Sequence, residues 1–308
     1  MPRPDVRVSK ARVTIARIAD TISLYDNRTH GMERPLADGM TSVDRLKADD
    51  AKTAEFSERG PDFLEVLARS IRVIDALGVT RHAPTISDLA RATDLPKPTV
   101  RRVLHTLCAL GYAEIMGRTF RLTPKIMRLA TSYLGSSGNS RVLQDACDRL
   151  SQATGQSSLT GVLDGQDVLV TAYTMPPQLM ATARGVGVRL PAFCTAAGRI
   201  LLSSLSDDHL NEFLKGLRPE KHTELTVVDK SRIKKEILQA RERGYAWMDD
   251  EYTLGWKTIA YPLRRHDGTL YGTLSLNSKK TPGLSNSQVE KFGRLCAEHA
   301  QALGPLLV

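Results

Sequence analysis

Cationic and hydrogen-bonding side chains recur between residues 97 and 105 at a spacing that suits contact with nucleic acid. If this stretch is helical, residues three or four positions apart share one side of it, which brings Arg101, Arg102 and His105 together. Arginine and lysine bind phosphate oxygens and the acceptor edge of guanine, and smaller polar side chains add hydrogen bonds. The candidate DNA-binding residues of this stretch are Lys97, Thr99, Arg101, Arg102 and His105.

The same stretch also has an apolar side. Its aliphatic residues recur every three or four positions and predict a buried stripe made of Val100, Val103, Leu104, Leu107 and Leu110. Pro98 fits the first turn, where no intrahelical hydrogen bond is lost, and Gly111 is suited to end the helix. Such a helix can bury one side in a small domain and present the other to the major groove of DNA.

Further helices are needed to hold this one in place. Thr85 and Asp88 have the spacing of a capping box, which predicts a short helix that begins there. This helix ends near Thr93, because Pro96 disfavours helical conformation in the residue before it. An apolar stripe over Leu64–Leu77 predicts a third helix upstream. Together the three predict a helix-turn-helix arrangement.

A hairpin is expected directly after these helices. Residues that favour strands stand on both sides of Gly117 and predict a hairpin over Tyr112–Leu122. Arg118 lies at its tip and Arg121 on its return strand, so both join the candidate DNA contacts. We interpret residues 61–123 as a winged helix-turn-helix domain that binds double-stranded DNA. The alternative is a winged domain used for contacts with other proteins.

The distribution of charge agrees with a DNA-binding function. The chain has 308 residues, 41% hydrophobic and 25% charged, and a net charge of +9, as expected for a globular protein with room for two cores. Residues 61–140 hold 11 basic and 6 acidic residues, the densest positive charge in the chain. Such a field attracts phosphate without specifying sequence, and its effect falls with added salt.

Motifs for other classes of function are missing from the sequence. The four cysteines are widely separated and form no C-x-x-C pair, so we expect neither a metal site nor disulfides. This usage of cysteine fits a protein located in the reducing cytoplasm. No run approaches the roughly 20 apolar residues of a membrane span. Phosphate-binding loops, H-E-x-x-H and G-x-S-x-G do not occur, so we expect no cofactor, no catalytic residue and no enzyme. An enzyme with a cysteine-histidine pair at Cys194 is a minor alternative.

The segments around the winged domain differ in character. Residues 1–60 mix charges with few aromatics and are expected to form a flexible extension, with Met40 as an alternative start of translation. Residues 124–140 are expected to form a linker helix, which Gly135–Gly138 interrupts.

Residues 141–308 are expected to form a second domain. Helices are predicted over Val142–Thr154, Ala196–Leu205, His209–Leu214, Ser231–Gly244 and Ser285–Leu303. Strands are predicted over Ser157–Leu163, Asp167–Tyr173, Met180–Ala183, Thr258–Leu263 and Leu270–Leu276. Asp-Gly turns at residues 164–165 and 267–268 indicate hairpins. The predicted fold class is therefore α+β, with an antiparallel sheet flanked by helices.

Several motifs, taken in order, are similar to those of one family. Over about residues 62–305 the chain resembles the IclR family of bacterial transcriptional regulators, and the matching segments are Ile86–Thr93, Leu95–Arg102, Phe120–Pro124, Arg189–Arg199, Arg243–Tyr245 and Ile259–Leu263. The segment around Cys194 and the Leu122–Pro124 junction most resemble the branch that regulates aromatic-acid and β-ketoadipate catabolism.

This resemblance implies a fold and a function. It implies an N-terminal winged helix-turn-helix and a C-terminal effector domain related to GAF-type sensors, in a homodimer or homotetramer on a palindromic operator. The function it implies is a ligand-responsive regulator of a catabolic operon that senses a small organic acid, aromatic or dicarboxylic. A redox sensor that works through Cys194 is an alternative.

The resemblance also implies an effector site at one end of the second domain's sheet. Carried over to this sequence, its residues are Met180, Ala196, Ala197, Asp249, Thr258, Ser275 and Asn277. Amide groups at the start of the helix from Ala196 would hold a carboxylate. Thr253, Trp256 and Lys257 depart from the family pattern.

Several residues in and around this predicted site could instead have a purely structural role. Thr195 could simply cap its helix, and Ser275 and Asn277, two apart on a strand, could both face solvent. Cys194 is more often a packed small side chain than a redox switch. The run Asp249–Glu251 is typical of a solvated loop.

Overall fold

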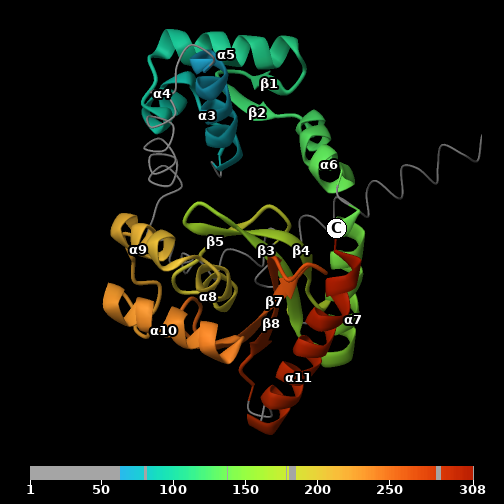
Figure 1. Ribbon diagram of the computed structural model, residues 1–308. Helices are drawn as coiled ribbons and strands as arrows, with labels where there is room; N and C mark the ends of the chain where they lie inside the picture. Colours follow the sequence, from blue (N-terminus) through green and yellow to red (C-terminus); the bar gives the residue numbers. More distant parts are fainter. Residues whose placement is uncertain are drawn as a thin grey trace, which may run out of the picture. The chain divides into compact units, whose positions relative to one another are not determined.

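The computed structural model describes residues 63–79, 82–136, 138–177, 179, 185–281 and 286–307. The extension expected over residues 1–60 and the strand predicted near Met180 lie outside these ranges. The described residues form a helical part with a small hairpin and a larger part built on a sheet, and each is described by itself (Figure 1).

The helical part consists of α3 (Glu65–Val79), α4 (Ile86–Thr93) and α5 (Lys97–Ala109). The predicted capping box is confirmed, because Thr85 Oγ1 accepts from the Asp88 amide at 3.3 Å while Asp88 Oδ2 accepts from the Thr85 amide at 3.0 Å. Asp94 adopts a left-handed conformation, with φ of 52°, and ends α4. Local sequence signals thus set the turn that precedes α5.

The core of this part is built from the predicted apolar stripe except for Leu110, which follows the end of α5 and is 54% exposed. Val100 and Leu104 on α5 are completely or almost completely buried, and they pack with Leu89 of α4 and Val73 of α3. Burial of each such side chain contributes about 1.5–3 kcal/mol. Because α5 buries this side, its opposite side is free to face a partner.

The predicted hairpin is formed by β1 (Ala113–Met116) and β2 (Thr119–Leu122), which pair in antiparallel register. Gly117 has a φ of 64° at the tip, which suits a residue without a side chain. The Phe120 amide donates to the Pro84 carbonyl at 2.9 Å, and this bond attaches the hairpin to the start of α4. The hairpin is therefore a wing with a fixed base.

A further helix, α6 (Met127–Ser136), follows a short 3-10 turn that begins at Pro124. The predicted interruption over Gly135–Gly138 is confirmed, because α6 ends at Ser136, although Gly135 itself still belongs to the helix. A glycine in the last turn costs only about 1 kcal/mol, which a helix tolerates. The next helix, α7 (Asn139–Thr154), begins three residues earlier than predicted.

The larger part is built on a six-stranded antiparallel sheet in the order β5-β4-β3-β8-β7-β6. Its strands are β3 (Ser157–Asp164), β4 (Asp167–Thr174), β5 (Arg189–Pro191), β6 (Ala246–Asp249), β7 (Trp256–Arg264) and β8 (Leu270–Lys279). The predicted hairpins β3–β4 and β7–β8 are confirmed, with Gly165 and Gly268 in left-handed conformation. The edge strands β5 and β6 were not predicted.

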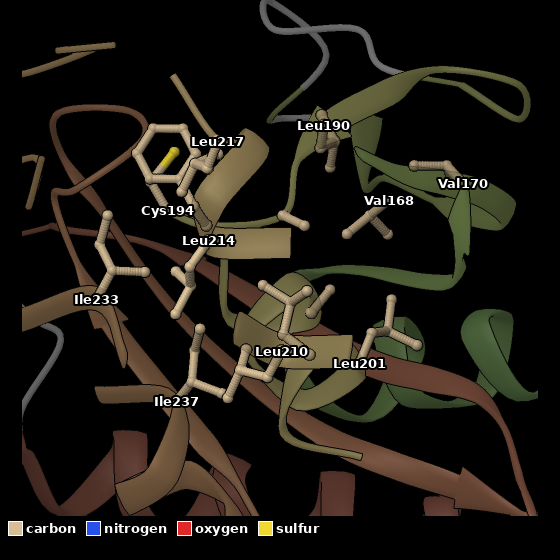
Figure 2. Close-up of a cluster of buried hydrophobic side chains, with 14 of the residues drawn as sticks. Val168, Val170, Leu190, Cys194, Leu201, Leu210, Leu214, Leu217, Ile233 and Ile237 are labelled. Atoms are coloured by element: carbon tan, nitrogen blue, oxygen red, sulfur yellow. The ribbon is translucent and has the colours of Figure 1, made fainter. Parts of the chain in front are cut away.

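Helices cover both faces of this sheet (Figure 1). One face packs against α7 and α11 (Asn286–Leu303), through a core that includes Leu150, Leu274 and Cys296. The other face packs mainly against α8 (Ala196–Ser203), and α9 (Asp207–Gly216) and α10 (Lys230–Arg243) add side chains to the same buried cluster. Figure 2 shows the aliphatic cluster on this second side. The predicted α+β class, with an antiparallel sheet flanked by helices, is confirmed.

Caps explain why two helices begin earlier than predicted, α9 by two residues and α10 by one. Ser206 accepts from the His209 amide at the start of α9, and Asp229 accepts from the Arg232 amide at the start of α10. Within the described ranges, no helix combines the length and the apolar character that crossing a bilayer requires.

Candidate functional site

The outward side of α5 carries an unpaired cationic surface. Lys97, Arg101, Arg102 and His105 are exposed, whereas Thr99 is half-buried. None of these five side chains forms a hydrogen bond or an ion pair with another described residue. Pro96 precedes the helix without a side-chain cap, so the positive end of the helix dipole also remains available. This surface can bind phosphates and base edges.

The two arginines of the wing differ in whether they have a partner within the protein. Arg118 is exposed at the tip and has no partner among the described side chains, whereas Arg121 forms an ion pair with Glu114 across the hairpin. Lys125, just after the wing, donates to the Leu110 carbonyl at 2.7 Å and stabilises the end of α5. Arg118 is thus free to bind phosphate, whereas Arg121 would first have to leave Glu114.

In the larger part, register brings three of the predicted effector residues to one sheet face. Thr258 and Asn277 are direct partners across β7 and β8, and Ser275 lies two residues before Asn277 on the same face. Ser275 is also the partner of Leu159 on β3 and of Ala260 on β7. Ser275 is 1% exposed, so the alternative that it faces solvent is wrong.

Helix α8 covers this same face with its first turn. Ala196 belongs to the buried cluster that contains Ala260, and Ala197 to the cluster that contains Leu159. Because Ser275 pairs with both Leu159 and Ala260, its hydroxyl lies beneath this first turn.

The close approach of α8 depends on a glycine. A side-chain carbon at Gly198 would lie 2.1 Å from the Ala192 carbonyl oxygen, much too close for any other residue. The helix start is thereby fixed against the chain that leads into it.

Hydrogen-bonding groups are left unsatisfied at this point. Thr195 caps α8, as one alternative predicted, by accepting from the Gly198 amide at 3.2 Å. The amides of Ala196 and Ala197 find no acceptor among the described residues, and the Ser275 hydroxyl is buried without a partner. A buried polar group without a hydrogen bond costs about 1–3 kcal/mol. Three such donors in one place are suited to an anionic or hydroxylated ligand.

The polar surface extends along the next row of the sheet. The side chains of Thr258 and Asn277 are half-buried and form no hydrogen bond with another described residue. Ser157 is the partner of Asn277 on β3, is 2% exposed and also has no side-chain hydrogen bond within the described ranges. Sequence reasoning missed Ser157; its alternation with Leu159 on the strand was the available signal.

Asp249 is not part of this group. It pairs with Lys257, whereas its neighbour Met248 pairs with Thr258, so Asp249 and Thr258 point to opposite faces of the sheet. Its carboxylate lies 3.6 Å from Lys257 Nζ and also contacts Lys280. The expected place of Asp249 beside Thr258 therefore needs correction, and the cause is the register of the unpredicted strand β6.

Cys194 lies completely buried among aliphatic side chains (Figure 2). Burial raises the pKa of its thiol far above the ordinary value, and the nearby carboxylate of Glu251 adds to this effect. Because the thiolate is the reactive form, this cysteine is suited to packing and not to redox chemistry. The remaining predicted residue, Met180, lies outside the described residues.

Comparisons with known proteins agree with this arrangement. Residues 66–114 match the model of the IclR helix-turn-helix domain, and residues 131–303 match that of the bacterial transcriptional regulator IclR C-terminal domain. The two matched ranges contain the cationic face of α5 and the polar face of the sheet.

Individual relatives agree as well. The chain is 34% identical over 234 residues to the Pca regulon regulatory protein of Pseudomonas putida, covering 76% of this chain and 80% of that protein. A transcriptional regulator of Rhodococcus sp. RHA1 has a similar structure, with a TM-score of 0.67 and 32% identity over 79% of this chain and 97% of that one. Both relatives are named as regulators and not as enzymes, in agreement with the prediction for this chain.

A more distant solved structure has the same fold. It is an IclR homolog of Microbacterium hydrocarbonoxydans in complex with 4-hydroxybenzoate, with a TM-score of 0.64 and 23% identity over 78% of this chain and 97% of that one. With both domain models matched in order and a relative above 30% identity over three quarters of its length, this chain belongs to the IclR family of bacterial transcriptional regulators.

Proposed function

We propose that this chain is a ligand-responsive regulator of a catabolic operon, and that its effector is a small organic acid bound beneath the first turn of α8. The observation that carries the proposal is the set of buried, unpaired donors formed by Ser275 and the amides of Ala196 and Ala197. Their desolvation is unfavourable unless a ligand accepts their hydrogen bonds.

The chemistry of these groups favours a carboxylate. Free N–H groups at a helix start, together with the positive end of the dipole, bind anions without a buried lysine. Thr258, Asn277 and Ser157 lie one row away and offer neutral hydrogen-bonding groups to the far end of a ligand. A hydroxyl at that end, as on a phenolic ring, would find partners there.

Names of relatives support an aromatic acid or its degradation product. One relative regulates the Pca regulon, and another was solved with 4-hydroxybenzoate. We therefore choose 4-hydroxybenzoate and β-ketoadipate as the first probes. Met180 remains a proposed apolar wall, and Asp249 is left out of the proposed site because of its orientation.

The proposed contacts with DNA are made by α5 and the wing. Lys97, Thr99, Arg101, Arg102 and His105 are proposed to contact the major groove, and Arg118 the backbone. One winged domain contacts few base pairs, so we propose that a homodimer or homotetramer binds a palindromic operator in the cytoplasm. The proposed division is a DNA-binding domain over 61–123, a linker over 124–140 and an effector domain over 141–308.

The experiment has two halves. The operator is selected from a random duplex library with the full-length chain, and fluorescence anisotropy then gives its Kd with and without each probe. Calorimetry measures binding of the probes directly, and chromatography tests whether they are recovered unchanged. A probe that binds, is recovered intact and shifts the operator Kd supports the proposal.

Each other outcome points to a different error. Conversion of the probe into a product would favour an enzyme. Failure of both probes to bind, or binding that leaves the operator Kd unchanged, would contradict the proposed effector. An oxidant that shifted the operator Kd through Cys194 would favour the redox alternative.

A further inference from the structure

Arg199 is a buried cation at the point where three segments of the effector part meet. Arg199 is only 2% exposed, and its guanidinium donates to both carboxylate oxygens of Glu251, at 3.0 and 2.9 Å. The carboxylate of Glu236 on α10 lies 3.7 Å from the same guanidinium. Arg199 on α8 is thereby joined to α10 and to the loop that connects β6 with β7.

That loop is held from two other directions. The Thr223 and Thr226 hydroxyls donate to the backbone carbonyls of Asp250 and Glu251, at 2.7 and 2.6 Å. Asp250 Oδ1 in turn accepts from the amide of Gly255 at 2.6 Å, just before β7 begins. Glu251 therefore has little freedom to move independently of the start of β7.

The ion pair consequently joins the two walls of the proposed effector site. On one side, Arg199 belongs to the first turn of α8, and its amide donates to the Thr195 carbonyl at 2.9 Å. On the other side, the loop that carries Glu251 leads directly into β7 and Thr258. No other ion pair between α8 and this loop is found within the described residues.

The ion pair of Arg199 with Glu251 is expected to contribute little to the free energy of unfolding, and more to the relative placement of the two segments it joins. Two buried charges lose hydration that their attraction only partly restores, and apolar replacements are often as stable. The Arg199 Nε has no hydrogen-bond partner, which adds a further cost. A bidentate pair does, however, fix both the distance and the angle between the segments it joins.

We infer that Arg199 is a positioning residue of the effector site, whose ion pair with Glu251 sets the first turn of α8 at the correct separation from Thr258 and Asn277. This inference rests on the proposed function, because it assigns a role to Arg199 in that same site. The role assigned to the guanidinium is positioning, because both of its terminal nitrogens donate to the carboxylate of Glu251.

The test uses the full-length chain with Arg199→Gln, Glu251→Gln and the double substitution. Each single variant removes the bidentate pair and leaves one of its two charges buried, with Glu236 as the carboxylate that remains near Arg199, whereas the double variant leaves two amides that can bond to each other. Asp207→Asn is the matched control, because it removes an exposed ion pair with Arg241 near the other end of α8. Arg199→Lys serves as a milder variant if a single variant fails to fold, since lysine keeps the charge but lacks the fork.

Two quantities are measured: the Kd for 4-hydroxybenzoate, and hydrogen exchange of peptides that cover residues 196–199 and 256–260. Each single variant is expected to weaken binding at least about tenfold and to speed exchange in both peptides, while the double variant recovers to within about threefold of wild type. Operator affinity without ligand should stay within about twofold, as should every quantity in the control variant.

Three results would overturn the inference. They are a single variant that binds the probe as wild type does, a double variant whose loss equals the product of the two single losses, and faster exchange in only one peptide. If wild type itself does not bind 4-hydroxybenzoate, the proposed choice of effector fails. The exchange data then still decide whether Arg199 positions both walls.

Discussion

Glu114 and Arg121 are register partners across the wing, and their side chains form an ion pair that neutralises one positive charge on the hairpin. Both side chains are about half exposed, at 45% and 57%. Exposed pairs of this kind contribute little to stability, so Arg121 can exchange its carboxylate for a phosphate. Glu114 therefore acts as a built-in competitor of DNA at the wing.

Glu114→Gln should accordingly strengthen binding to all DNA sequences alike. We expect roughly a two- to tenfold lower Kd at low salt, and a salt dependence steeper by about one charge. Anisotropy titrations at several salt concentrations, on the operator and on random duplex, measure both. Arg118→Ala is the reference for an unpaired wing arginine, and an unchanged Kd for Glu114→Gln would show that Arg121 does not reach DNA.

Arg101→Ala and Arg102→Ala should each weaken operator binding by about 1–3 kcal/mol, because a base contact made by an arginine has that value. The loss should be smaller on random duplex, since base contacts specify sequence. Arg69→Ala on α3 is a suitable control, because Arg69 already pairs with Glu65. Equal losses on both DNAs would identify the two arginines as phosphate contacts instead.

Ser275→Ala should separate stability from effector binding. Removing a buried hydroxyl that lacks a partner is expected to leave the free energy of unfolding unchanged or to raise it by up to about 1 kcal/mol. Affinity for 4-hydroxybenzoate should fall at the same time, because the ligand loses a hydrogen bond. Denaturant titration and calorimetry give the two quantities. A destabilised variant with normal affinity would assign Ser275 a purely structural role.

Cys194→Ala should respond to peroxide as wild type does in operator binding. The thiol is fully buried and its pKa is raised by that burial, so little thiolate forms near neutral pH. In the native protein we expect Cys108, which is half-buried, to react with a thiol reagent before Cys194. Mass spectrometry of the labelled peptides identifies the order, and early labelling of Cys194 would reopen the redox alternative.

Thr85→Ala should lower the stability of the winged domain by about 1 kcal/mol through loss of a helix cap. The same cap gives a pH dependence, because hydrogen bonds from the Thr85 side chain and backbone lower the pKa of Asp88 below its ordinary value. The pKa is lower in the folded state, so the bonds to the Asp88 carboxylate stabilise the fold above its unfolded pKa of about 4, and this part is lost as pH falls through the folded pKa. Thermal unfolding of wild type and Thr85→Ala should therefore differ less at pH 3 than at pH 7, and the remaining difference reflects the bond from the Asp88 amide to Thr85 Oγ1.

The features that could be predicted from the sequence are those that neighbouring residues determine. The capping box at Thr85 and Asp88, the left-handed glycines of the hairpins and the stripe through Val100 and Leu104 each depend on residues a few positions apart. Periodicity and turn chemistry carry this information directly.

Features that depend on distant pairing could not be predicted in this way. The face on which Asp249 lies is decided by the pairing of β6 with β7, and four residues gave too short a pattern to reveal that strand. Ser157 becomes a neighbour of Asn277 only through contact between segments 120 residues apart. The ion pair of Arg199 with Glu251 also joins distant segments, 52 residues apart in sequence.

The tight contact at Gly198 limits how this protein could acquire a new ligand. Any bulkier residue at Gly198 would push α8 away from Ala192, so substitutions at this position of the helix wall are expected to be rare. The strand wall is different, because Thr258 and Asn277 are only half-buried and have room to differ in size and polarity. Substitutions that change the ligand specificity of such regulators are therefore expected on the strands, while the residues at the start of the helix stay the same.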